Sequence, residues 1–305
     1  MAPVRAHEVA MIRSVTYAAL FDYPLTPAQV AESLPGMTAN GTTVTRWWSA
    51  SPALQAAIDW RDGYFVPSGR ADLVGRRVRR EAISHGVLAR HRRALTVMAA
   101  LPFVRMVALS GSLAHLNADE NGDLDLFVVT APGRVWLVTV AAIVVARLCG
   151  WRRRLCLNYV VSERALAVEP DDFFAANQIL HLRPIAGEEV YRRFLHANPF
   201  IWDHYPNFEA RSLQSWASLD RWAARARRPA EWLLAFVGAP AERLCRLAYG
   251  RHLRRRAATW QSRDQVRLEP ECLKLHTSSH RADVLARFEA ALAHALAPEQ
   301  RRRTG

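Results

Sequence analysis

Two aspartates on an apolar segment are the feature that most constrains the fold of this chain. Asp123-Leu124-Asp125-Leu126 opens a run that stays apolar almost to Thr130. Side chains alternate between the two faces of a β-strand, so Asp123 and Asp125 should project from one face with Cα atoms about 6.6 Å apart. Carboxylates that face the same way on a core strand repel each other unless a cation or a basic group compensates. The pattern therefore predicts a buried strand that carries a cation site at its beginning.

A strand and a tight turn are expected directly before these aspartates. Pro102 ends a helical pattern, and residues 104–109 form a short apolar strand pattern. Ser110-Gly111-Ser112 follows as a turn, and a short helix is expected at 113–118. A glycine at the exit of a strand lets the backbone approach a triphosphate closely, while the Ser112 hydroxyl and the free N–H groups of the helix can donate to an anion. We therefore expect Ser110, Gly111 and Ser112 to bind nucleotide phosphates.

Strand and helix patterns alternate over about 90 residues around this motif. A second strand is expected at 124–130, a buried helix at 135–148 and a third strand at 155–161. This alternation predicts a compact unit of strands and helices over residues 101–190.

The order strand, Gly-Ser turn, short helix and Asp-x-Asp strand resembles the DNA polymerase β-like nucleotidyltransferase superfamily. The residues that carry the resemblance are Leu109-Ser110-Gly111-Ser112 and Gly122-Asp123-Leu124-Asp125-Leu126, a motif that small bacterial nucleotidyltransferases share with much larger polymerases. The resemblance implies an α+β fold with a mixed sheet for this domain. It also implies that Asp123 and Asp125 are catalytic and bind two Mg²⁺ ions, and that Gly111 and Ser112 hold a nucleoside triphosphate. Bound Mg²⁺ would polarise the α-phosphate, lower the pKa of an acceptor hydroxyl and neutralise the pyrophosphate leaving group.

The family pattern usually adds a third carboxylate on a later strand, and this chain departs from it. Asn158 stands at the expected place in the 155–161 segment. An amide oxygen can ligate a metal ion weakly, so Asn158 is a candidate metal ligand, but it cannot act as a base. Glu163 and Asp171 are alternative carboxylates.

Two functions follow from this reasoning. The first is Mg²⁺-dependent transfer of a nucleoside monophosphate from an NTP, with ATP the expected donor, to an unidentified hydroxyl acceptor. The alternative is a catalytically degenerate protein that binds nucleotide or nucleic acid and acts in regulation. Metal-linked ATP binding favours the first function, and binding to duplex nucleic acid alone favours the second.

The charge of the chain and its single lysine bear on the partner. The net charge is +13 and the pI is about 10.6, which suits a polyanion such as nucleotide phosphates, nucleic acid or anionic lipid. Of 41 lysine and arginine residues only Lys274 is a lysine, so it is a candidate for a site where a guanidinium cannot serve. Lys274 alternates with His276 at the end of a strand pattern at 268–275, and we expect Lys274 to contact a phosphate; a surface lysine is the alternative.

Residues 1–70 are expected to form a winged-helix-like domain. Thr26-Pro27-Ala28-Gln29 is a capping box that opens a helix, after an amphipathic segment at 7–20 and before a third helix at 44–58. Asp62-Gly63 predicts a two-residue hairpin turn. Such domains bind DNA in some proteins, but the adjacent Trp47 and Trp48 favour packing or an intramolecular contact.

The remaining regions are expected to be mostly helical. Residues 71–100 should form a connecting helix rich in arginine, whose basic side chains face either solvent or phosphate. Residues 191–305 should form a helical C-terminal region, ending in a helix at 282–297. A basic helix with tryptophans can lie on a membrane surface, although Gly238 and Pro240 interrupt this one. The longest apolar stretch, 135–146, is too short to span a bilayer, and no secretory signal is evident, so a cytoplasmic location is expected.

Overall fold

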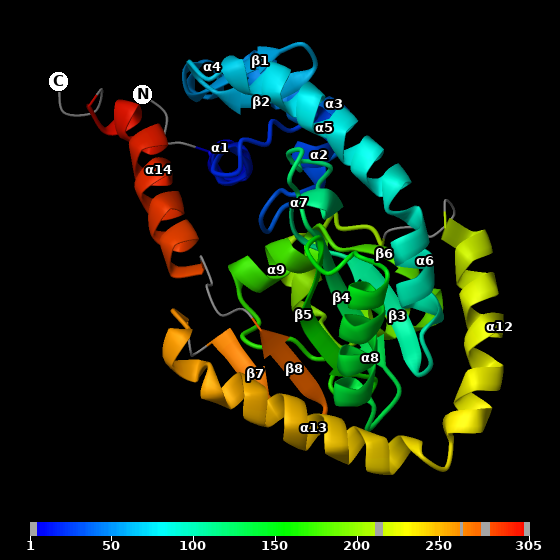
Figure 1. The fold of residues 1–305 in the computed structure, drawn as a ribbon. Helices are drawn as coiled ribbons and strands as arrows, with labels where there is room; N and C mark the ends of the chain where they lie inside the picture. The colour runs from blue at the N-terminus through cyan, green and yellow to red at the C-terminus, as the bar shows by residue number, and fades with distance from the viewer. Residues whose placement is uncertain (1–4, 211–215, 263–264, 276–280, 302–305) are drawn as a thin grey trace.

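A six-stranded mixed sheet lies at the centre of the molecule (Figure 1). The computed structural model describes residues 5–210, 216–262, 265–275 and 281–301, with the side chains at positions 158, 217 and 297–301 excepted. The strand order is β6 (Arg183–Ala186), β3 (Val104–Leu109), β4 (Leu124–Thr130), β5 (Leu155–Ser162), β8 (Cys272–Leu275), β7 (Val266–Leu268). β4 and β5 are parallel, and every other neighbouring pair is antiparallel. The expected α+β class with a mixed sheet is confirmed.

Strand β4 is buried on both faces. Leu124, Leu126 and Val128 pack into one apolar core, and Phe127 and Val129 pack into another on the opposite face. The first core is completed by α6 (Arg92–Ala100), α8 (Val135–Leu148), α12 (Ala217–Leu234) and α13 (Gly238–Arg255), and the second by α9 (Phe173–Leu180), α10 (Glu188–His196) and α11 (Phe200–His204). A strand covered on both sides needs a nearly continuous apolar sequence, which is the pattern that β4 carries.

Several predicted boundaries around the motif match the structure, and two do not. β3, β4 and α8 have the predicted bounds, and β5 extends one residue further, to Ser162. The helix expected at 113–118 is instead the single turn α7 (Gly111–Ala114), since Leu116 adopts a positive φ of 54° and stops it. The strand expected at 268–275 is a hairpin, β7 and β8, because Pro270 lacks an N–H for the ladder.

The sheet extends beyond the segment expected at 101–190. Strand β8 pairs with β5 through Tyr159 and Lys274, and α10 runs across residue 190. Residues far apart in the sequence therefore complete one sheet.

The first 70 residues form three helices, a fourth short helix and a hairpin. The elements are α1 (Ala6–Ala19), α2 (Pro27–Glu32), α3 (Gly41–Ala50), α4 (Pro52–Ala57), β1 (Ile58–Arg61) and β2 (Tyr64–Pro67). The Thr26 capping box is present, with Thr26 N–H donating to Gln29 Oε1 over 3.0 Å. Asp62 and Gly63 both have positive φ in the predicted hairpin turn. The helix expected at 44–58 is divided at Ser51, because Pro52 disfavours helical geometry in the residue before it.

This N-terminal module is attached to the rest of the chain by polar and apolar contacts. The Asn207 side chain accepts a hydrogen bond from Ala39 N–H and donates to the carbonyls of Ala31 and Met37. Helix α14 (Arg281–Arg301) runs alongside α1 (Figure 1) and contributes Leu292 to the module's core. Trp48 packs in that core and donates to the Ile58 carbonyl over 2.9 Å. The tryptophans thus serve packing, as the sequence favoured.

The connecting arginine-rich segment is two helices, not one. α5 (Asp72–Arg90) ends at His91, where α6 begins. Arg76 and Arg80 pair with Asp22 of the N-terminal module. Arg77 is buried, with its guanidinium 3.9 Å from the ring centroid of Tyr23. These arginines therefore join the module to the sheet, which neither of the two sequence-based alternatives anticipated. A 3-10 turn at Ala257–Thr259 completes the elements.

Across the described ranges 5–210, 216–262, 265–275 and 281–301, no helix is both long and apolar enough to cross a membrane.

The N-terminus of α8 is capped from another helix. The buried Glu242 of α13 accepts hydrogen bonds from Trp136 N–H over 3.0 Å and Leu137 N–H over 2.7 Å. A carboxylate is favoured there by the helix dipole as well as by the two otherwise unpaired donors.

Replacing Glu242 by alanine should lower the free energy of unfolding by about 2 kcal/mol, because two N–H donors at a buried helix end lose their acceptors. Glu242→Gln should cost less because it keeps one acceptor oxygen. The midpoint of urea unfolding measures both, and Glu189→Ala, at an exposed position on α10, is the matched control. Equal midpoints for Glu242→Ala and the control would contradict this role.

Candidate functional site

Gly111 and Asp125 are in direct contact at the beginning of β4. Gly111 has a φ of +62°, and a Cβ placed on it would lie 2.4 Å from Asp125 Oδ2. Ser110 N–H donates to the Asp125 carbonyl over 2.9 Å, which holds the turn against the strand. Glycine is therefore required at 111 for two reasons, backbone conformation and space for the carboxylate.

Strand β5 places Cys156 and Tyr159 beside β4 through an irregular register. Cys156 is the partner of Asp125, and Tyr159 is the partner of Phe127, so the register shifts by one residue at Asn158. An extra residue resets the alternation of side chains along a strand. Cys156 and Tyr159 therefore both lie on the face that carries Asp125.

The Cys156 thiol is held in its neutral form. Its Sγ lies 4.0 Å from Asp123 Oδ2. Burial, followed by the negative charges of Asp125 and Asp123, raises the pKa of Cys156 to about 11. The thiol is therefore a weak donor to Asp123 at neutral pH, and it cannot act there as a base or as a thiolate nucleophile.

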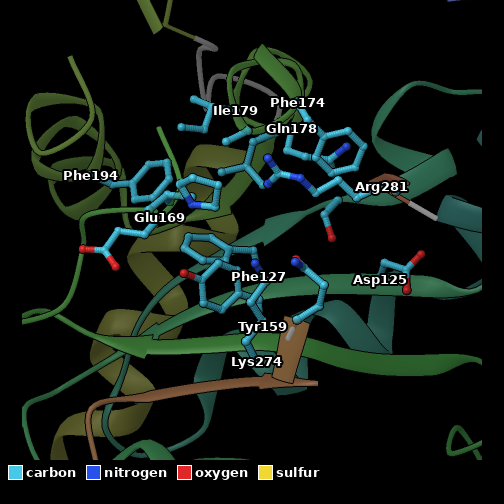
Figure 2. Close-up of a pocket in the computed structure, with 17 residues that line it drawn as sticks. Asp125, Phe127, Tyr159, Glu169, Phe174, Gln178, Ile179, Phe194, Lys274 and Arg281 are labelled. Atoms are coloured by element: carbon cyan, nitrogen blue, oxygen red, sulfur yellow. The ribbon is translucent and has the colours of Figure 1, made fainter. Parts of the chain in front are cut away.

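One cavity brings together four of the residues expected to bind nucleotide or metal. Ser110, Gly111, Asp125 and Lys274 line a cavity of about 190 Å³ between the sheet and α9. In Figure 2, Phe127, Tyr159 and Lys274 lie below the cavity, while Phe174, Gln178 and Arg281 lie above it. Lys274 Nζ is 5.4 Å from the centroid of the Tyr159 ring. The single lysine thus lies in a cavity with the Gly-Ser turn, not on the open surface.

The cavity has an apolar end and a polar end. Phe194 lies at one end and Asp125 at the other in Figure 2, and Ile179 and Leu182 add apolar surface to the lining. Burial raises the pKa of Tyr159 above its usual range, so its hydroxyl stays neutral. Such a cavity suits a ligand with a flat apolar group and an anionic group.

A second hollow, of about 600 Å³, adjoins the first at Gly111, Asp125 and Gln178. Its lining includes Ser112 and Asp123 and is rich in hydrogen-bonding groups: Arg80, His115, Asn117, Asn121, Asn177 and His181. The rings of His115 and His181 are 3.9 Å apart between centroids. Ser112 and Asp123 therefore face a different hollow from Lys274, and Asp125 faces both.

The two alternative carboxylates, Glu163 and Asp171, line neither of the hollows that Asp125 faces. The backbone of Asn158 is in β5 at the register shift, and its side chain lies outside what the structure describes, as does residue 276. Glu163 follows the far end of β5 and pairs with Arg193 over 2.7 Å. Asp171 lines a separate hollow with Asn198 and Arg267. Neither alternative carboxylate can therefore stand in for the missing one.

Within the described part of the chain, no three His, Cys, Asp or Glu side chains form a group that could hold a metal ion. Asp123 and Asp125 remain as a pair of carboxylates lining one hollow. Mg²⁺ is commonly bound by one or two carboxylates together with substrate phosphates and water. The two aspartates therefore fit Mg²⁺ that is shared with a phosphate-bearing ligand.

Sequence reasoning did not find the aromatic and cationic lining of the cavity. Phe127, Tyr159 and Phe174 carry no motif that distinguishes them from other apolar residues, and Arg281 is one arginine among 40. Arg281 pairs with Asp172 and lies 5.7 Å over the Phe174 ring, at the start of a helix distant in sequence. The alternation of Phe127 with Asp125 on one strand face was the signal that could have revealed part of this lining.

Comparison with models of known protein families, with curated proteins and with solved structures gave no match to this chain.

The contact between Gly111 and Asp125 can be measured as a coupling. Gly111→Ala should lower the free energy of unfolding by about 1–2 kcal/mol for its positive φ alone. The new methyl group at position 111 should also clash with Asp125 Oδ2, which adds to the loss of stability. In the Asp125→Ala background this clash is absent, so the same glycine substitution should cost less. Urea unfolding of both single variants and the double variant should therefore give a coupling of about 1 kcal/mol.

Gly150→Ala is the control for backbone strain, since Gly150 has a φ of +74° and open space around its Cα. The contact is contradicted if Gly111→Ala costs the same with and without Asp125.

Proposed function

We propose that this chain is a Mg²⁺-dependent nucleotidyltransferase of the DNA polymerase β-like kind, with an NTP, taken to be ATP, as donor and a hydroxyl compound as acceptor. The observation that carries the proposal is the single cavity lined by Ser110, Gly111, Asp125 and Lys274, next to a second hollow that shares Gly111 and Asp125. Transfer between two substrates requires two adjoining sites that meet at the reacting group.

The first cavity suits the nucleotide. Phe127, Tyr159 and Phe174 offer aromatic surface for a base, and Lys274 and Arg281 offer positive charge for phosphates. Gly111, without a Cβ, lets the Asp125 carboxylate lie against the turn, so that both residues line this cavity. Because α7 is one turn long, the helix N-terminus contributes less to anion binding than the sequence suggested, and the cationic side chains contribute more.

The second hollow suits the acceptor. Arg80, Asn117 and Asn121 can orient a polar compound by hydrogen bonds, while Asp123 lines this hollow and Asp125 lies at its boundary with the nucleotide cavity. In the reaction, the acceptor oxygen bonds to the α-phosphorus, the bond to the bridging oxygen breaks, and pyrophosphate leaves. The hydroxyl proton would pass to Asp123 or Asp125, whose carboxylates line this hollow.

Asp123 and Asp125 would hold Mg²⁺, two ions by the family resemblance. Bound Mg²⁺ supplies neutralisation of the triphosphate charge and lowers the pKa of the acceptor hydroxyl. The residues of the chain orient the two substrates and shield the base from water.

The N-terminal module is proposed to be winged-helix-like, with an intramolecular role. Helix α3 would be its recognition helix, yet Arg46 is the one basic residue in Gly41–Ala50. The hydrogen bonds of Asn207 and the ion pairs of Asp22 tie the module to the sheet region. These contacts favour a structural role over reading of DNA.

A second candidate is nucleotide binding without transfer. The observation that favours it is that β5 presents Cys156 and Tyr159, and not a carboxylate, to the face that carries Asp125. In that case a nucleotide would act as a regulatory ligand.

Nucleotide binding is expected to depend on Mg²⁺. Calorimetric titration with ATP should give an affinity at least about tenfold higher with Mg²⁺ than with EDTA, because two carboxylates and a triphosphate repel each other without a cation. Asp123→Asn should reduce this metal dependence and abolish transfer. Transfer is followed by incubating the chain with α-phosphate-labelled NTPs and cell extract and finding the labelled acceptor by mass spectrometry.

Transfer by Asp123→Asn at the rate of the unaltered chain would overturn the proposed chemistry. Mg²⁺-linked ATP binding without any labelled acceptor would support the second candidate, and binding to duplex DNA alone would favour the nucleic-acid-binding form of the alternative function.

Lys274→Met should weaken ATP binding by about tenfold to a hundredfold, the typical loss for one charged hydrogen bond to phosphate. Lys274→Arg should restore the affinity only in part, because the larger planar guanidinium has to fit between Tyr159 and Arg281. Arg192→Met is the matched control, since Arg192 is exposed on α10 and pairs with Glu188 outside the cavity. Equal ATP affinity for Lys274→Met and the control would contradict a contact between Lys274 and the nucleotide.

A further inference from the structure

Large exposed apolar side chains gather at the corner between α12 and α13. We define the elbow patch as Trp232, Leu233, Leu234, Phe236, Val237, Leu244 and Leu247. Phe236 is 91% exposed and Trp232 is 76% exposed, values unusual for aromatic residues. In Figure 1 the two helices run along the outside of the molecule and meet at an angle. Large apolar side chains exposed close together on neighbouring elements are typical of a binding surface.

The charges on the same two helices are divided by sign between their inner and outer faces. The exposed ones are arginines: Arg221, Arg225, Arg228, Arg243, Arg246, Arg251, Arg254, Arg255 and Arg256. Between positions 216 and 262 the acidic residues are Asp220, Glu231 and Glu242. The side chains of all three point inward and bond to other elements of the protein.

Each of these acids has a structural partner. Asp220 accepts from Gly187 N–H over 2.8 Å, and Glu231 accepts from Phe103 N–H and from the Arg105 guanidinium, each over 2.7 Å. Glu242 caps α8, as described above. The negative charges therefore hold the helices to the sheet region, and the outer surface of α12 and α13 is left apolar and positively charged.

From this division we infer that the elbow patch docks on an anionic lipid membrane. The apolar side chains at the corner would enter the boundary between headgroups and acyl chains, and the flanking arginines would meet lipid phosphates. Leu244 and Leu247 lie beside Arg243 and Arg246 on α13, so both types of contact come from one helix. The interruption at Gly238 and Pro240, which argued against a single membrane-surface helix, creates the corner that exposes Phe236 and Val237.

Two other occupants fit the surface less well. A nucleic acid would satisfy the arginines but would leave the aliphatic residues of the corner exposed to water or against phosphates. A second copy of the chain would bury the apolar residues but would bring two arginine-rich faces together. An anionic membrane matches both the apolar corner and the charge. This inference does not depend on the proposed transferase activity.

The test is sedimentation of the full chain with vesicles of phosphatidylcholine, with and without 30% phosphatidylglycerol by composition. We expect binding to the anionic vesicles that weakens with added NaCl, and little binding to the neutral ones. Phe236→Asp should reduce binding by at least about tenfold, because it removes an aromatic ring that the membrane would bury and adds a negative charge that the anionic lipid repels. Val78→Asp is the matched control, because Val78 is an exposed apolar residue on α5, outside the patch.

The folded state is checked by circular dichroism, where both variants should match the unaltered chain because both sites are exposed. Arg243→Gln with Arg246→Gln should weaken binding and its salt dependence while leaving the apolar corner intact. The inference is overturned if anionic vesicles do not bind, or if Phe236→Asp binds them as well as Val78→Asp does. If the unaltered chain does not bind vesicles, the occupant of the patch is sought among the other two. Loss of duplex DNA or RNA binding in Phe236→Asp would then identify a nucleic acid, and dissociation of a dimer would identify a second copy of the chain.

Discussion

The burial of β4 on both faces is the constraint on which the rest of the structure depends. A strand at the centre of a mixed sheet cannot carry charge along its length, so its carboxylates are confined to the first residues, where the strand emerges from the core. Asp125 is half-buried at that point, in contact with Gly111. The Gly-Ser turn and the two hollows lie at the beginning of β4, where the apolar packing on one face of the strand ends. Gly111 and Asp125 line both hollows for this reason.

The sheet brings distant parts of the sequence to that point. β3 supplies the turn, β5 supplies Cys156 and Tyr159, and β8 supplies Lys274 through its pairing with β5. Arg281, at the start of α14, completes the cavity from the side opposite the sheet. The base of the site is thus built from neighbouring strands of one sheet, and the proposed in-line transfer requires a triphosphate held in one position.

The parts of the fold that were predictable are those governed by local signals. β3, β4 and α8 follow from apolar periodicity, α2 from the Thr26 capping box, and the hairpin from Asp62-Gly63. Lys274 was singled out by composition alone, and the structure places it with Gly111. What could not be predicted depends on tertiary contacts: the register shift at Asn158, the aromatic lining of the cavity, and the inward acids of α12 and α13. No local pattern indicates which way an acidic residue on an amphipathic helix will turn.

The central claim is that the cavity between the sheet and α9 holds the base of a nucleoside triphosphate. It is tested most directly by irradiating the chain with 8-azidoadenosine triphosphate and Mg²⁺ and locating the adduct by peptide mass spectrometry. The account predicts labelling of peptides that contain Phe127, Tyr159 or Phe174, suppressed by excess ATP. Labelling confined to other peptides, or labelling of these peptides that excess ATP does not reduce, would contradict it.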